Sequence, residues 1–382
     1  MDSPLQDVTV LDLSRFLAGP FCTRVLHDLG AEIIKIERPK VGDDAREYGP
    51  YVNERSAYFS SLNYGKKSVT LNLKSEEDRN NFLELVKISD VLVENFRPGT
   101  MEKLNIGYET LKEINPKIIF SSVSGFGQNG PYSQKPSMDM IVQACGGIMS
   151  ITGEPDGEPV RVGVSIGDIT AGLFNAIGIL SALYQREETG QGQRVDISML
   201  DCQAAILENP IARYAATGEV PGPVGSRHPS ITPYQAFETS DDWIVVAVGN
   251  NSIWERFCHA LEREDLVEDS RFENNHKRSQ NHEELEEILQ DEMIEYTTEE
   301  LIEMFEENDV PCTPINSVDN LLENPQLKHR NMLLNMAGKA MKDFMVAGNP
   351  VKMSSLEDKQ EVPAPPELGE HNEEILNRIE DS

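Results

Sequence analysis

The sequence predicts an α/β protein whose larger part is an open parallel sheet, followed by a smaller α+β domain. Three observations support this class. Residues 8–37 read as strand, helix and strand; further strand-like segments lie at 68–73, 90–94 and 117–123; and beyond residue 216 the chain becomes rich in Gly and Pro and then acidic and helical. Repeated β/α units build parallel sheets and bind ligands at the carboxyl ends of their strands.

The first unit carries clear boundary signals. Residues 8–13 alternate in polarity, and a helical pattern over residues 21–29 follows Gly19-Pro20. Gly30 stops this helix, and residues 31–37 form the second strand. Farther on, Ser75 and Asp78 have the spacing of a capping box, so a helix is expected from there to about residue 88.

A glycine motif follows the strand-like segment 117–123. Gly125, Gly127 and Gly130 match a dinucleotide-binding GxGxxG pattern. Pro131 and Pro136 would break the helix that this pattern needs, and no later strand supplies the acidic residue expected about 20 positions on. We therefore do not favour a dinucleotide site.

The rest of the chain divides by composition. We expect a short helix over 138–145, a long one after Asp168, a strand over 194–197, and a helix to about residue 216. Later we expect a hairpin over 234–248, helices over 254–261, 283–294 and 298–306, and an extended piece at 311–315. The predicted domains are residues 1–216 (large), 217–233 (linker), 234–325 (small) and 326–382 (a return segment packing on the large domain).

Charge and cysteine content narrow the function classes. Lys+Arg 34 against Asp+Glu 65 gives a net charge of −31, which argues against nucleic-acid binding and is typical of salt-adapted proteins. The five cysteines are scattered and never form a CxxC pair, which suits a reducing cytoplasm. No apolar run reads as a membrane span, and the N-terminus lacks a signal pattern, so we expect a cytoplasmic protein without a membrane partner.

Asp168 is the main candidate for chemistry. It stands where the run RVGVSIG changes into the apolar helical pattern of residues 169–183. Such an Asp is commonly a helix N-cap, but it can also be an ionised nucleophile aimed into a cleft by the helix N-terminus. The stretch alone leaves both readings open.

Other site types find little support. No metal-ligand spacing, GxSxG elbow or P-loop is present. An early basic group suggests an anionic small molecule with phosphates, although ordinary solvated charge is an equal reading; its members are Lys35, Arg38, Lys40, Lys66, Lys67, Lys74, Arg97 and Lys103.

Six motifs resemble the class III CoA-transferases, the CaiB/BaiF family that includes formyl-CoA transferase. They span nearly the whole chain in the family's order: VLDLSRFLAGPFCTRVLHDLGAEIIKIERP (10–39), DVLVENFRPG (90–99), SGFGQNGP (124–131), VSIGDITAGLFNAIGILSAL (164–183), GQGQRVDISMLD (190–201) and the closing PPELGEH. The resemblance implies a Rossmann-like large domain, a smaller domain and an interlocked homodimer.

The resemblance also assigns residues. The family's catalytic aspartate falls on Asp168, and an acidic residue assisting near the acyl group falls on Asp139. Oxyanion donors are expected from the helix N-terminus at Asp168 and from Gly249-Asn250. Contacts to coenzyme A, which is a substrate and not a permanently bound cofactor, fall on Leu17, Ala18, Arg38, Leu71, Asn72, Leu73, Lys74, Asn95, Phe96, Arg97 and Lys103.

The implied reaction moves CoA from an acyl-CoA, expected to be succinyl-CoA, to a carboxylic acid through an aspartyl mixed anhydride and an aspartyl-CoA thioester. The small-domain text VGNNSIWERFCHAL resembles the dicarboxylate branch, and the single Gly249 with two Asn disfavours oxalate. Arg15, Arg46 or Arg161 could pair with a distal carboxylate.

Two alternatives stay open. An α-methylacyl-CoA racemase needs a His before the Asp, where this chain has Met138, and a thioether cannot shuttle a proton. A non-catalytic acyl-CoA-binding protein would have no need of Asp168.

Overall fold

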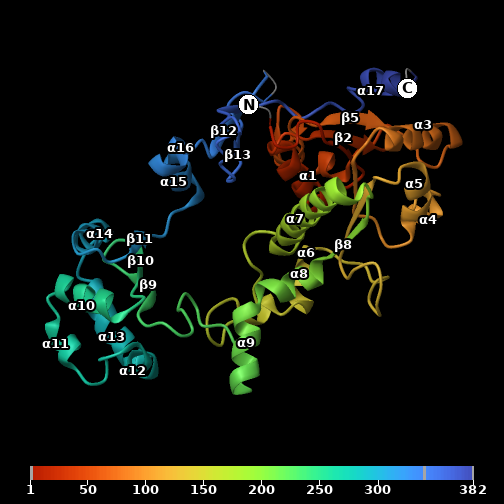
Figure 1. Cartoon of the computed structure of the whole chain (residues 1–382). Helices are drawn as coiled ribbons and strands as arrows, with labels where there is room; N and C mark the ends of the chain where they lie inside the picture. The colour runs from red at the N-terminus through yellow and green to blue at the C-terminus, as the bar shows by residue number, and fades with distance from the viewer. Residues whose placement is uncertain (1–2, 339–340, 381–382) are drawn as a thin grey trace. The chain divides into compact units, whose positions relative to one another are not determined.

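The computed structural model describes residues 3–338 and 341–380, and the chain forms two compact units (Figure 1). Unit 1 comprises Met1–Ile148, Arg161–Gly218 and Pro325–Ser382, and unit 2 comprises Met149–Val160 and Glu219–Asn324. Residues 149–160, which the sequence analysis included in the large domain, belong to unit 2, where the Gly225 N–H donates to the Gly153 carbonyl at 3.0 Å.

Unit 1 is built on a six-stranded sheet in the order β5-β2-β1-β6-β7-β8, with every neighbouring pair parallel. The strands are β1 (Thr9–Asp12), β2 (Glu32–Glu37), β5 (Lys67–Thr70), β6 (Val91–Glu94), β7 (Ile119–Ser124) and β8 (Arg194–Ser198). The sheet grows outward from β1 in one direction and then from β6 in the other, which is the doubly wound order. The predicted fold class is confirmed, and the order reverses between β1 and β6.

The two faces of this sheet have separate cores because neighbouring residues of a strand point to opposite faces. Val10 packs in the core with α1 and α7, whereas Leu11 packs in the core with α3, α5 and α17. The helices of unit 1 are α1 (Ala18–Asp28), α2 (Ala57–Asn63), α3 (Glu76–Lys87), α4 (Thr100–Lys103), α5 (Tyr108–Ile114), α6 (Asp139–Cys145), α7 (Ile166–Thr189), α8 (Met199–Ile206), α9 (Glu208–Thr217), α16 (Pro325–His329) and α17 (Asn372–Glu380).

Short elements complete unit 1. They are the 3-10 helix η1 (Asp44–Glu47), the pair β3 (Tyr51–Val52) and β4 (Arg55–Ser56), and a sheet of β12 (Leu333–Met336), β13 (Met345–Ala347) and β14 (Glu361–Val362). A second 3-10 helix, η2 (Ile148–Ile151), begins at Ile148, where the first segment of unit 1 ends, and its other residues belong to unit 2. In the return segment, Asn372 bonds to Thr70 at the end of β5, with the Thr70 N–H donating to its side chain at 2.8 Å.

Unit 2 is a small α+β unit with its own core. The antiparallel sheet β11-β10-β9 contains the predicted hairpin, with β9 (Tyr234–Glu238), β10 (Trp243–Ala247) and β11 (Cys312–Pro314). Its helices are α10 (Asn251–Ala260), α11 (Glu264–Glu268), α12 (Asn275–Gln280), α13 (His282–Met293), α14 (Thr298–Glu307) and α15 (Val318–Glu323). Residues 219–233, most of the predicted linker, contain no helix or strand.

Local expectations were wrong at three places. Ser75 does accept from the Asp78 N–H, but the Asp78 carboxylate turns to the Asn72 N–H instead of closing a capping box. The helix expected to run to about residue 216 is interrupted at Leu207, between α8 and α9. The third is α7, whose length and apolar composition would suffice to span a membrane, although no such run was expected; half of its most apolar window is buried inside the chain.

The glycine motif forms no dinucleotide loop. No helix occurs between residues 125 and 138, which are fully described. Gly127 and Gly130 have positive φ angles of 82° and 88° within this turn-rich loop. The pyrophosphate-binding helix N-terminus that the fingerprint needs is therefore missing here.

Candidate active site

The site begins at the N-terminus of α7, which packs closely against α1. Gly172 makes this approach possible, because a Cβ there would lie 2.8 Å from the Ala18 carbonyl oxygen. The packing fixes the first turn of α7 beside the residues that follow β1. Asp168 is the third residue of α7.

Asp168 is not the N-cap of this helix. Ser165 occupies that position without a side-chain cap bond, and the capping oxygen comes from Asp139 at the start of α6. Asp139 Oδ1 accepts from the Gly167 N–H at 2.8 Å and the Asp168 N–H at 3.4 Å. Gln143 donates to its Oδ2 at 2.7 Å, so both oxygens of Asp139 are engaged.

The Asp168 carboxylate itself accepts no hydrogen bond from the part of the chain that the structure describes, and its oxygens are not among the fully buried ones. Burial first, and then the charge of Asp139, raise the pKa of Asp168 to about 7. The helix N-terminus was expected to hold this group ionised, but burial and the like charge outweigh it. A carboxylate that gains nothing from hydrogen bonding is a stronger nucleophile than a solvated one.

The first amides of α7 cannot serve a reaction intermediate. Those of Gly167 and Asp168 bond to Asp139, that of Ile166 to the Val164 carbonyl and that of Ile169 to the Ser165 carbonyl. The helix N-terminus is thus not a source of oxyanion donors, which corrects the sequence-based expectation.

Gly249 and Asn250, the other expected donors, lie in unit 2. The Asn250 side chain caps α10, where its Oδ1 accepts from the Ile253 N–H at 3.0 Å. Gly249 and Asn250 are exposed residues, and their backbone N–H groups have no acceptor within residues 3–338 and 341–380. Unlike those of α7, these amides are available.

A cavity of about 540 Å³ opens at the carboxyl ends of β1, β2, β5 and β6. Of the residues expected to contact CoA, those that line it are Arg38, Leu71, Asn72, Leu73, Lys74 and Phe96. Leu17 and Ala18 are almost fully buried, and Arg97 and Lys103 are exposed outside this cavity. The Asn95 side chain bonds to the backbone of Arg15 instead of lining the cavity.

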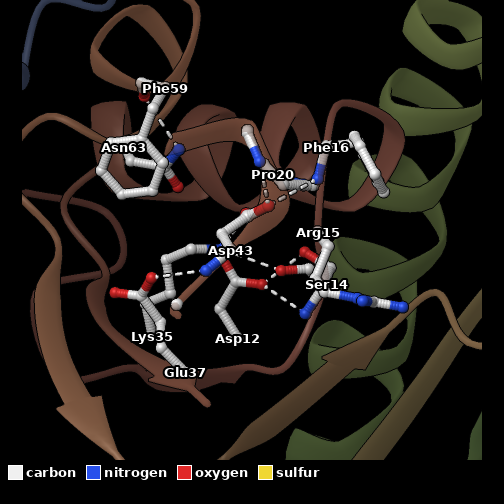
Figure 2. A network of polar contacts seen from close by, with 12 residues as sticks. Asp12, Ser14, Arg15, Phe16, Pro20, Lys35, Glu37, Asp43, Phe59 and Asn63 are labelled. Carbon is white, nitrogen blue, oxygen red and sulfur yellow. Dashed lines mark hydrogen bonds and ion pairs between the residues drawn. The ribbon is translucent and has the colours of Figure 1, made fainter. Parts of the chain in front are cut away.

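Two of the early basic residues are buried and paired with carboxylates, so they are not free phosphate ligands. Lys66 is fully buried, with its Nζ 3.0 Å from Asp12 Oδ2, and burial lowers its pKa to about 8. Lys35 is also buried, with its Nζ 2.9 Å from Asp43 Oδ2. Both lysines belong to an internal network of ion pairs around Asp12, of which Figure 2 shows the part with Lys35 and Asp43.

The three arginines proposed for a distal carboxylate differ in availability. Arg46 is engaged by Glu37 through two nitrogens, at 2.8 and 2.7 Å. Arg161 is exposed and bonds to backbone carbonyls of its own segment. Arg15 lines the cavity, pairs with Asp44 at 2.7 Å, and keeps a buried Nε that has no hydrogen-bond partner in the described chain.

Sequence reasoning missed two residues near Asp168. Tyr58 on α2 lies close enough that, after burial, the charge of Asp168 helps to raise the Tyr58 pKa to about 12. Gln143, one helical turn after Asp139, orients that carboxylate. The i,i+4 spacing of Asp139 and Gln143 was a usable signal, whereas nothing local marks Tyr58.

The sequence matches the family model described as CoA-transferase family III over residues 5–372. It is 44% identical to an acetyl-CoA:oxalate CoA-transferase of Acetobacter aceti, over 96% of this chain and 93% of that protein. It is 41% identical to a succinyl-CoA:mesaconate CoA-transferase of Haloarcula marismortui, over 98% of this chain and 96% of that protein.

Two further comparisons agree with these. A human succinyl-CoA:glutarate CoA-transferase is 40% identical, over 98% of this chain and 86% of that protein. A crystal structure of a CaiB/BaiF family protein from Brucella suis superposes with a TM-score of 0.88 and 37% identity, covering 99% of this chain and 100% of that one. The oxalate enzyme among these relatives weakens the expectation that Gly249 with two Asn disfavours oxalate.

Proposed function

The chain belongs to CoA-transferase family III, and from this premise we propose that it moves CoA from succinyl-CoA to a second dicarboxylic acid, with Asp168 as the covalent nucleophile. The observation that carries the proposal is the Asp168 carboxylate: it is unpaired, has an accessible oxygen and has a pKa raised by burial to about 7. An ionisable acid with this environment is set up for attack on a thioester and not for structural pairing.

The first half-reaction transfers CoA to the enzyme. The Asp168 carboxylate attacks the thioester carbonyl, the C–S bond breaks, and a mixed anhydride and CoA thiolate form. The thiolate then attacks the aspartyl carbonyl carbon, which releases the donor acid as a carboxylate and leaves an aspartyl-CoA thioester. No net proton is taken up or lost.

The second half-reaction repeats these steps in reverse. The acceptor carboxylate attacks the aspartyl thioester, giving a new mixed anhydride and CoA thiolate. The thiolate attacks the acceptor acyl carbon, and the Asp168 carboxylate is restored. Each attack passes through an oxyanion, for which the available amides of Gly249 and Asn250 are the donors we favour.

The choice of a dicarboxylate rests on relatives and on Arg15. Relatives named for mesaconate and glutarate use dicarboxylates, and oxalate, in the name of another, is also one. Arg15 lines the cavity, and its guanidinium is the group we propose to pair with a second carboxylate. Succinyl-CoA should therefore be tested against glutarate, mesaconate, citramalate and oxalate together.

We also propose that the protein is a homodimer, interlocked as in its family, in the cytoplasm. Support comes from α7, where large apolar side chains stay exposed: Leu173 at 44%, Ile177 at 57% and Tyr184 at 75%. An apolar helix face of this kind is typical of a subunit interface. The five cysteines are all free, as suits a reducing compartment.

One experiment tests the nucleophile. Asp168→Asn should abolish exchange of labelled succinate into succinyl-CoA, and Asp201→Asn should not, although Asp201 is likewise the third residue of its helix. Treating the wild type with succinyl-CoA and then hydroxylamine should convert the Asp168 side chain to a hydroxamate, detectable in its peptide by mass spectrometry. Exchange that survives Asp168→Asn, or an unmodified peptide, would refute the covalent step.

A further inference from the structure

The loop after β1, residues 14–17, contains a backbone conformation that its side chain disfavours. Phe16 has φ 64°, in the left-handed region. A residue with a Cβ seldom adopts this region, and Phe lacks the short polar side chain that lets Asn or Asp do so. Something else in the fold must hold this turn.

Asn95 holds one side of the turn. Its Oδ1 accepts from the Arg15 N–H at 2.9 Å, and its Nδ2 donates to the Arg15 carbonyl at 2.8 Å. Both polar atoms of the Asn95 side chain therefore bond to the backbone of Arg15, the residue before Phe16. Asn95 directly follows β6 and Arg15 belongs to the loop after β1, so this clamp spans the two strands between which the sheet order reverses.

Asp43 holds the other side, as Figure 2 shows. Its Oδ1 accepts from the Phe16 N–H at 3.2 Å, and its Oδ2 lies 2.9 Å from the buried Lys35 Nζ. Lys35 in turn donates to the Ser14 carbonyl at 2.8 Å. Residues 14, 15 and 16 are therefore each fixed by a side chain from another segment.

The position of this loop connects it to the reaction. Ser14 and Arg15 line the cavity at the strand ends, and Ala18, just beyond the loop, packs against Gly172 of the helix that carries Asp168. A ligand in a doubly wound sheet binds where the strand order reverses. The strained turn lies between the cavity and the nucleophile helix, so its shape sets their relative placement.

We propose that Asn95 is a positioning residue of CoA transfer: it holds the Phe16 turn so that a thioester in the cavity meets Asp168 in the attacking geometry. This rests on the proposed role of Asp168. It replaces the earlier expectation of a direct Asn95–CoA contact with an indirect role through Arg15.

A double-mutant cycle tests the proposal. Asn95→Asp keeps the acceptor for the Arg15 N–H but places an oxygen against the Arg15 carbonyl, which opens the clamp. We expect kcat/KM to fall about tenfold or more, since small misplacements of reacting groups are costly. Adding Phe16→Gly should restore several-fold of the loss, because Gly adopts this conformation without strain.

A positioning role of Asn95 predicts that the effect of Phe16→Gly depends on the residue at position 95, whereas a direct contact of Asn95 with CoA does not. Phe16→Gly alone loses the packing of Phe16 on Tyr48, whose ring centroids are 5.9 Å apart, and should lower kcat/KM or leave it unchanged. The same change should raise kcat/KM when Asn95 is Asp. Equal effects of Phe16→Gly in both backgrounds, or no loss with Asn95→Asp, would overturn the proposal.

A second variant and a binding measurement distinguish loss of folding and loss of chemistry from loss of positioning. If Asn95→Asp fails to fold by circular dichroism, Asn95→Ala enters the same cycle without adding a charge. Binding of free CoA, measured by calorimetry through the same cycle, reports the coupling without any chemistry. Failure of the covalent step would appear as an unmodified Asp168 peptide in the wild type, whereas failure of the positioning role would appear as absent coupling.

Discussion

The charge of Asp139 should set the pH at which the enzyme works, and Asp139→Asn tests this. Asn keeps an oxygen for the N–H groups of Gly167 and Asp168, now at 2.8 and 3.4 Å, so the start of α7 keeps its cap. The amide removes the negative charge next to Asp168. In the proposed reaction the nucleophile is the ionised form of Asp168, so removing this charge should make the nucleophile available at lower pH.

The size of the effect follows from the site. The pKa of Asp168 rises from 3.8 to about 7, with burial as the larger cause and Asp139 as the smaller. Asp139 therefore accounts for less than half of that rise. We expect the acid limb of the pH–rate profile, with its midpoint near 7 in the wild type, to move down by about one pH unit, or about 1.4 kcal/mol.

The assay is a single turnover of succinyl-CoA with hydroxylamine trapping, measured at a series of pH values. Gln143→Met is the matched control: it removes the 2.7 Å hydrogen bond to Asp139 but leaves the charge, so its midpoint should stay near that of the wild type. A midpoint that stays in place or rises in Asp139→Asn would refute the electrostatic reasoning. Loss of the reaction at every pH would instead assign Asp139 to the chemistry.

Four further outcomes are expected. Asp168→Asn should raise the free energy of unfolding at neutral pH by about 1–3 kcal/mol in urea. The reason is that a carboxyl group whose pKa is raised on folding costs stability as the pH rises from about 4 to 7. Asp201→Asn, at an exposed site, should leave the free energy of unfolding unchanged. Ile177→Glu should reduce self-association in sedimentation, whereas Ile88→Glu, at another exposed apolar residue, should leave it unchanged. Lowering the salt concentration should lower Tm, because a net charge of −31 repels itself less when screened; a Tm indifferent to salt would exclude salt adaptation. Gly249→Pro removes one available amide and should reduce kcat about a hundredfold, whereas Gly249→Ala, whose Cβ would meet nothing within 4 Å, should be nearly neutral.

The fold could be predicted from sequence because its signals are local. Alternation over residues 8–13, a helical pattern ended by Gly30 and a second strand define a β-α-β unit without knowledge of its surroundings. The same holds for the hairpin of β9 and β10. Strand ends moved by one to three residues: β6 begins at Val91 where residue 90 was expected, and β5 ends at Thr70 where residue 73 was expected. Such ends depend on pairing with the neighbouring strand, which a local pattern does not contain.

The site was harder to predict from sequence than the fold, because its contacts join segments that are distant in the chain. The oxygen that caps α7 comes from Asp139, nearly thirty positions before Asp168, and a capping rule that considers only neighbouring residues could not find it. Lys35 and Lys66 looked like phosphate ligands because charge type does not reveal burial, yet both pair internally with acidic residues. Asn95 was assigned to CoA because the family motif contains it, although its side chain holds Arg15.

The hydrogen bonds at the start of α7 also limit which backbone amides can stabilise an oxyanion. A helix N-terminus normally offers free amides to a developing negative charge. Here the cap from Asp139 and two local bonds use all of them, so α7 presents a carboxylate without donors beside it. We therefore expect the oxyanion donors from another segment; Gly249 and Asn250 are exposed residues whose amides are unpaired among the described residues.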